Sequence, residues 1–290
     1  MEHKILIAIS FAVLAALLLA GCGSPTPVVK KVDHVVVTTG DPKQLFDLFT
    51  GTLGLPTAWP LADYPEFSTG GVQAGNVNIE TLRLGPAVPQ GSKTSVATMK
   101  TAIYGIVFEP YPLAAATKEL QARGAKPGKP SVQTAPFNGK NVPVWTNVTL
   151  NALSRPFYTV YLCQYSPSYA AVLSSHKASG TLGAIGLTSV RQVVIASKDP
   201  DAVKKQWQKA LAPAPMSSDG VMTVGTGPQI RFIKGSEDTI VSMLWEVASL
   251  SKAKALLEQN KLLGPSSASE LSIAPEAVQG LDIRMVEAAK

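Results

Sequence analysis

The feature of this sequence that most constrains its fold is a segment that occurs twice, at a constant offset of 158 residues. The apolar run at 32–37 corresponds to a second apolar run at 190–195. In each copy an Asp-Pro pair follows, at 41–42 and at 199–200. An aspartate caps the first turn of a helix, and a proline at the first helical position leaves no N–H unpaired. Each copy therefore predicts a buried strand followed by a helix.

A second pair of segments repeats the same pattern at an offset of 137 residues. The apolar run at 103–109 corresponds to the run at 240–246, and leucines at helical spacing follow both. Further strand-like runs come after the helices, at 77–84, 145–150, 159–165, 229–233 and 281–286. We therefore predict an α+β protein of four strand–helix–strands units. They are paired as 31–166 and 186–290, and a linker at 167–185 with a helix at 168–175 joins the pairs.

The N-terminus has the pattern of an export signal. Lys4 precedes a run at 5–19 that is apolar except for Ser10. The run is shorter than the ~20 residues of a transmembrane helix but fits the core of a signal peptide. The run ends at Leu19-Ala20-Gly21-Cys22, which resembles the lipobox of bacterial lipoproteins. The resemblance implies a signal peptide at 1–21, lipid on the sulfur of Cys22 and a lipidated tether at 22–30.

That resemblance makes membrane lipid a partner through acylated Cys22. It places the protein in the bacterial cell envelope, on the outer membrane facing the periplasm if the host has two membranes. Several acyl chains anchor a protein stably where a single chain does not. An ordinary secretory signal with an incidental cysteine is the alternative.

Charge and cysteine content indicate neither nucleic-acid binding nor a fold held by disulfides. The net charge is +6, but the basic residues are scattered, which indicates a solvated surface and predicts no nucleic-acid partner. With Cys22 lipidated, Cys163 is the remaining cysteine, so no intrachain disulfide is expected. Its apolar strand context predicts a buried, unreactive thiol.

Several segments together resemble a known superfamily. They are His34 on the first strand, the helix after Asp41-Pro42, Leu53-Gly54-Leu55-Pro56, the strand ending at Glu80 and the strand at 105–110. They are similar to the glyoxalase/bleomycin-resistance/extradiol-dioxygenase (vicinal oxygen chelate) superfamily, and look closest to glyoxalase-like bacterial proteins. The resemblance is good over 31–166 and weak over 186–290. It implies two tandem domains, each of two βαβββ modules, whose curled mixed sheet forms a cup for a metal and a small ligand.

The resemblance also indicates where metal ligands would lie, on the first and last strands of each module. In the first domain these positions hold His34, Glu80, Gly105 and Gln164. Because glycine has no side chain, His34, Glu80 and Gln164 are the expected ligands of one divalent metal. With His34 and His176 as the only histidines after the signal, these positions make no site of two histidines and one carboxylate, which argues against an extradiol dioxygenase.

The corresponding positions of the second domain predict a degenerate copy. They hold Gln192, Arg231, Ser242 and, less closely matched, Glu287. The fixed positive charge of Arg231 is unfavourable beside a cation. We therefore expect no metal in the second domain.

Aromatic residues indicate a binding pocket in the first domain. Trp59, Tyr64 and Phe67 lie in a predicted loop between the helix and the cup strands, and Trp145 and Asn147 are expected to face the same cavity. Such a lining suits a small, partly apolar ligand. The alternative is that these aromatic side chains fill the core of the domain.

His34 and Glu80 also have alternatives to a metal site. His34 can be a strand histidine that is hydrogen-bonded within the cup. Glu80 can pair with Arg83, or act as a general base without metal, because burial raises a carboxyl pKa. Two functions follow: a membrane-anchored protein that binds a small ligand, or a metal-dependent lyase or isomerase that uses His34 and Glu80.

Overall fold

The computed structural model of this chain describes residues 25–64, 66–85, 100–137, 140–175 and 177–289. The predicted signal peptide and Cys22 lie outside the described residues. Within the described part, no helix combines the length and apolar character that a membrane crossing requires.

Over its described residues, the first domain forms eight strands, two α-helices and a short π-helix. They are β1 (Val29–Thr38), α2 (Pro42–Asp47), the π-helix η1 (Leu48–Thr52), β2 (Thr57–Asp63), β3 (Phe67–Gln73), β4 (Asn78–Leu84), β5 (Ala102–Pro110), α3 (Leu113–Ala122), β6 (Ser131–Phe137), β7 (Lys140–Thr149) and β8 (Thr159–Tyr165). The strand order is β2-β3-β4-β1-β5-β8-β7-β6. The opening strands β1 and β5 pair antiparallel at the centre, and each pairs parallel with the closing strand of its own module.

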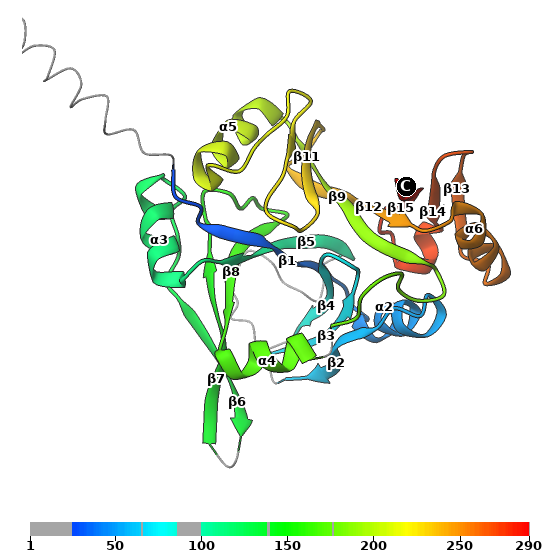
Figure 1. Cartoon of the computed structure of the whole chain (residues 1–290), viewed down its shortest axis with the longest axis horizontal. Coiled ribbons are helices and arrows are strands. Elements are labelled where there is room, and N and C mark those ends of the chain that lie inside the picture. Colours follow the sequence, from blue (N-terminus) through cyan, green and yellow to red (C-terminus); the bar gives the residue numbers. More distant parts are fainter. Residues whose placement is uncertain (1–24, 65, 86–99, 138–139, 176, 290) are drawn as a thin grey trace, which may run out of the picture.

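The second domain repeats this arrangement with seven strands. After the connecting helix α4 (Pro167–Ser175) come β9 (Leu187–Ser197), α5 (Pro200–Leu211), β10 (Val221–Met222), β11 (Gln229–Lys234), β12 (Thr239–Val247), α6 (Leu250–Gln259), β13 (Leu263–Ser266), β14 (Leu271–Ile273), the 3-10 helix η3 (Pro275–Val278) and β15 (Ile283–Glu287). Its strand order is β10-β11-β9-β12-β15-β14-β13. The two sheets join where β5 meets β12 (Figure 1). The predicted α+β architecture of paired modules with curled sheets is confirmed.

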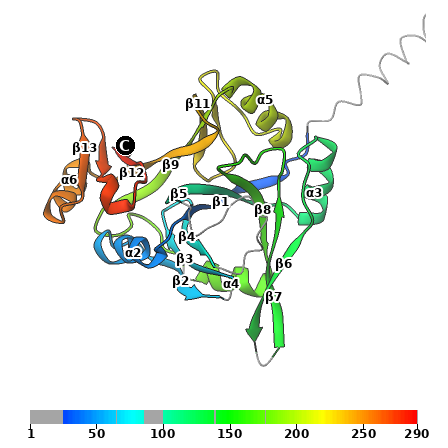
Figure 2. The same cartoon turned by 180° about the vertical axis from the view of Figure 1, so that it is seen from behind.

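The helices that follow the repeated strands begin as the sequence predicts. Asp41 accepts a hydrogen bond from the Gln44 backbone N–H, and Asp199 accepts one from that of Ala202. A proline opens both helices. The predicted linker helix is α4, and both views show it lying across the hollow side of the first-domain strands (Figures 1 and 2).

The prediction that Trp59 lies in a loop is wrong, because Thr57–Asp63 form strand β2. This strand lies at the edge of the sheet and pairs only with β3 among the described strands. An edge strand tolerates Pro60, since one side of it has no partner that needs an N–H. Trp59 and Phe67 are thus held by strands, and Tyr64 lies in the connection between β2 and β3.

One hydrophobic core runs through both domains. Fully buried Trp207 of α5 contacts Phe108 of β5, with ring centroids 6.1 Å apart. Trp245 of β12 contacts Phe49 at 6.0 Å. Because large aromatic side chains contribute strongly to packing energy, the domains stabilise each other.

Candidate functional site

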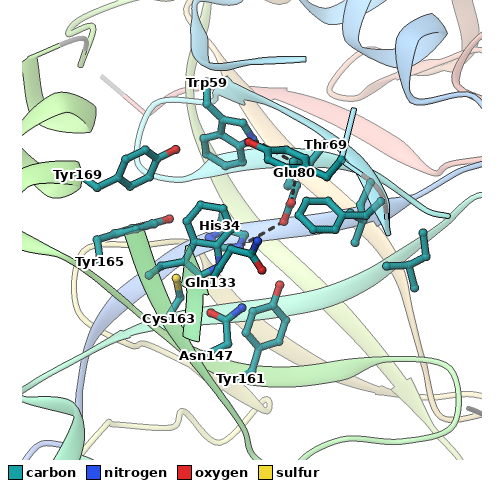
Figure 3. Close-up of a pocket in the computed structure, with 15 residues that line it drawn as sticks. His34, Trp59, Thr69, Glu80, Gln133, Asn147, Tyr161, Cys163, Tyr165 and Tyr169 are labelled. Atoms are coloured by element: carbon teal, nitrogen blue, oxygen red, sulfur yellow. Dashed lines mark hydrogen bonds and ion pairs between the residues drawn. The ribbon is translucent and has the colours of Figure 1, made fainter. Parts of the chain in front are cut away.

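The cup of the first domain encloses a cavity of about 200 Å³ lined by fifteen residues (Figure 3). The structure places seven of the eight sequence-predicted site residues around it: His34, Trp59, Tyr64, Phe67, Glu80, Trp145 and Asn147. Gln164 is the exception. The aromatic residues of this set therefore surround a free volume.

His34 lies on the central strand β1 and is held between two carboxylates. Its Nε2 is 3.4 Å from Glu80 Oε2, and its Nδ1 is 2.8 Å from Asp33 Oδ2. Burial acts to lower the pKa of His34, but the hydrogen bond to Asp33 and the negative charges of Asp33 and Glu80 outweigh it and raise the pKa to about 9. The side chain is therefore an imidazolium at neutral pH.

Asp33 was not predicted as a site residue, because alternation along a strand sends neighbouring side chains to opposite faces. Asp33 accordingly does not line the cavity, but beside an irregularity in the β1–β5 pairing its carboxylate reaches Nδ1 of the His34 ring. Asp33 is buried and also accepts a hydrogen bond from the Tyr165 hydroxyl at 2.8 Å. Burial acts to raise the pKa of Asp33, and the bond and charge of His34 outweigh it, so the pKa is lowered.

Glu80 enters from β4 and connects His34 to the wall of the cavity. Its Oε1 accepts a hydrogen bond from the Thr69 hydroxyl at 2.6 Å, and Thr69 in turn accepts one from the Trp59 indole N–H at 3.3 Å. Arg83 contacts Ser68 at 2.7 Å and Asp63 at 3.7 Å. The alternative that Glu80 pairs with Arg83 is therefore wrong.

Gln164 lies on the other side of β8 from the cavity. Tyr161, Cys163 and Tyr165 line the cavity at alternate positions of this strand, so the residue between the last two points away from it. The Gln164 Oε1 accepts a hydrogen bond from the Leu113 N–H at 2.7 Å, at the start of α3. The prediction that Gln164 shares a metal with His34 and Glu80 is wrong.

The position that corresponds to Glu80 in the second module holds Tyr161. Tyr161 pairs with Val107 in β5–β8 as Glu80 pairs with Val36 in β1–β4. Gly105 corresponds to His34, and a Cβ atom there would lie 3.0 Å from the Val36 side chain. The second module thus contributes a glycine and a buried phenol in place of ligands.

The residues present do not fit the metal that the resemblance implies. Among the described residues no three His, Cys, Asp or Glu side chains are grouped as metal ligands. A ligating imidazole must offer a nitrogen lone pair, whereas His34 is an imidazolium placed between the carboxylates of Asp33 and Glu80. Burial and the nearby Glu80 charge raise the pKa of Tyr161 well above its ordinary value, so its phenol stays neutral.

The cavity thiol belongs to Cys163, which is free and buried as the sequence predicts. Burial, followed by the charge of Asp33, raises its pKa far above the ordinary range. A neutral thiol is a poor nucleophile and a poor metal ligand. Cys163 therefore acts as a small apolar part of the lining.

The second domain lacks the charged cluster. Arg231 pairs with Val194 in the register in which Glu80 pairs with Val36. Gln192, at the position of His34, donates a hydrogen bond to Gln229 at 3.2 Å. The Glu287 carboxylate accepts a hydrogen bond from the Leu250 N–H at the start of α6, at 3.0 Å. Gln164 has the same role at the start of α3. The four predicted second-domain positions include no histidine, so they form no imidazole–carboxylate pair.

Replacing Gln164 by alanine is expected to lower the free energy of unfolding by about 1 kcal/mol, because α3 loses the acceptor at its first turn. Chemical denaturation measures this change. Ligand binding in the cup stays unchanged, and Glu287→Ala, which removes the matching acceptor of α6, serves as the control. A loss of ligand affinity in Gln164→Ala alone would contradict the placement of this side chain.

Neither a protein-family model nor a curated protein sequence matches the chain. Solved structures do match it. A hypothetical protein from Staphylococcus aureus is similar with a TM-score of 0.60 and 13% identity, covering 89% of this chain and 99% of that one. A mutant 4-hydroxymandelate synthase from Streptomyces coelicolor gives a TM-score of 0.59 and 11% identity, covering 90% of this chain and 93% of its own.

Homoprotocatechuate 2,3-dioxygenase from Arthrobacter globiformis is also similar, with a TM-score of 0.54 and 10% identity. This match covers 92% of the chain and 82% of the dioxygenase. The synthase and the dioxygenase are vicinal oxygen chelate proteins, so the chain has the fold that the sequence resemblance implied. At these identities the likeness concerns the fold alone.

Proposed function

We propose that this protein is a membrane-anchored lipoprotein that binds a small, partly apolar molecule in the cup of its first domain. The observation that carries the proposal is the cavity between Trp59, Trp145 and the His34–Glu80 pair. Protein sites for small molecules combine an apolar, aromatic lining with a few placed polar groups. A cavity of about 150 Å³ holds benzene. A cavity of about 200 Å³ therefore suits one aromatic ring with a small substituent.

The alternative, a metal-dependent lyase or isomerase, is less well supported by the donor set. It requires at least three protein ligands in the cup. Because the Gln164 side chain caps the start of α3 and Gly105 has no side chain, two predicted ligands remain, His34 and Glu80, and they form an ion pair with each other. We therefore favour binding over metal-assisted chemistry.

Binding is tested with single-ring probes. Benzyl alcohol, titrated into the full chain in detergent, is expected to change the fluorescence of the cavity tryptophans, with empty micelles as the blank. Trp145→Ala removes a wall of the cavity and should weaken binding about tenfold or more, the equivalent of about 1.4 kcal/mol. Phe157→Ala, at a ring that is 52% exposed and does not line the cavity, should bind as the unchanged protein does. Equal affinity in both variants would refute the proposal.

Anchoring is tested separately. The chain expressed in a bacterial host with labelled palmitate should carry the label and partition with membranes. Cys22→Ser should carry none and leave the membrane fraction. Labelling of the Cys22→Ser variant would contradict the lipidation site and leave the binding proposal intact.

A further inference from the structure

We propose that the molecule bound in the cup is an organic cation, with an ammonium group on a single-ring body. This inference rests on the proposed function and names the class of ligand. Three observations carry it: the aromatic walls, the distribution of charge on the cavity surface, and the polar groups of the neighbouring tyrosine and asparagine side chains.

The walls supply the faces that attract a cation. Tyr169 of α4 lies between two rings, with its centroid 5.8 Å from that of Trp145 and 5.7 Å from that of Tyr165. The planes are tilted by 42° and 48°, so the rings form a corner instead of a stack. Figure 3 shows Tyr169 and Tyr165 directed toward the hollow that Trp59 also faces. Aromatic corners of this kind recognise ammonium groups through the negative faces of the rings.

The charge on the cavity surface favours the same ligand. Among the described residues that line the cavity there is no lysine or arginine; Glu80 is the one acid, and the His34 imidazolium is the one cation. The imidazolium of His34 is closer to Asp33, at 2.8 Å, than to Glu80, at 3.4 Å. The longer distance lies beyond an ordinary hydrogen bond. Glu80 therefore keeps an oxygen that a ligand N–H can reach.

A lysine that contacts Asp33 lies outside the cavity. Lys31 is 3.5 Å from Asp33 and equally far from Glu109, and its side chain is partly exposed. It does not line the cup. Its charge is therefore shared between Asp33 and Glu109, neither of which lines the cavity.

The tyrosine phenols around the cup lie in the negative electrostatic field of Glu80 and Asp33. Burial is the largest cause that raises the pKa of Tyr161 and Tyr165, and the negative charges of Glu80 and Asp33 raise it further. A field that opposes a phenolate also opposes an anionic ligand and favours a cation. Asn147 adds an acceptor, because its buried Oδ1 has no hydrogen-bond partner within the described structure.

Three single-ring probes of similar size test the proposal: benzylamine as a cation, benzyl alcohol as its neutral counterpart and benzoate as an anion. Each is titrated calorimetrically at pH 7 into the full chain in detergent. Benzylamine is expected to bind about tenfold tighter than benzyl alcohol, within the range of cation–aromatic interactions. Benzoate is expected to bind most weakly.

Glu80→Gln should bring benzylamine and benzyl alcohol to within about threefold of each other, because the carboxylate charge is lost. Glu258→Gln, the same change on exposed α6, should keep the full preference. If Glu80→Gln does not fold, Tyr169→Leu tests the aromatic corner and should reduce the preference by itself. Equal binding of amine and alcohol, or tighter binding of benzoate, overturns the cation proposal and leaves the proposed function standing. Failure of all three probes to bind overturns both.

Discussion

Replacing His34 by alanine is expected to lower the free energy of unfolding by about 3–5 kcal/mol, the usual cost of removing one partner from a buried ion pair. The variant leaves the carboxylates of Asp33 and Glu80 without the cation that both contact. Chemical denaturation at pH 7 measures the loss. The double variant Asp33→Asn with His34→Ala should regain part of it, because one unpaired charge is removed.

The same cluster gives stability a pH dependence of known sign. The pKa of His34 is raised from 6.5 to about 9 in the folded protein, so its protonated form stabilises the fold. This contribution is fully present below about pH 6.5 and is lost as the pH rises through about 9. His34→Ala should lack this part of the profile. A variant as stable as the unchanged protein, with the same alkaline decline, would contradict the buried imidazolium.

Trp207→Ala is expected to cost about 3–5 kcal/mol and to destabilise both domains at once. Trp207 belongs to α5 of the second domain but packs on Phe108 of the first and on Phe232 of its own, at 6.1 and 5.3 Å between ring centroids. Because the core is continuous, near-UV circular dichroism and fluorescence of Trp59 and Trp145 should report one shared transition at lower denaturant.

The control for this change is Ile233→Ala on β11, where the side chain is 37% exposed. Surface substitutions of this kind stay within about 0.5 kcal/mol. Two separated transitions, with the first domain unaffected by Trp207→Ala, would show that the domains are energetically independent.

Repetition made most of the fold predictable. The two Asp-Pro helix starts specify local hydrogen bonds, and the structure forms both. The strand at 159–165 follows from its apolar run and has those bounds in the structure. The edge strand at 57–63 was missed, because Pro60 and a polar end resemble a loop and only pairing with β3 makes the segment a strand.

The site was predictable where side chains project regularly and not where the backbone deviates. Along β8 a shift of one residue exchanges the two faces, so placing the closing-strand position at Gln164 selected the wrong face. The alternation of Tyr161, Cys163 and Tyr165 in the sequence would have identified the inward set. The contact of Asp33 with His34 occurs beside an irregularity in β1, which no local pattern reveals. Tyr169 was hidden in a segment interpreted as a linker.

A crystal structure of the protein grown with benzylamine tests the central claim most directly. The account predicts the ring between Trp59 and Trp145 in the first-domain cup, with the amino nitrogen within about 3.2 Å of a Glu80 oxygen. It also predicts no bound probe at the corresponding positions of the second domain. A first-domain cup that holds only water, with the probe bound elsewhere, would contradict the account.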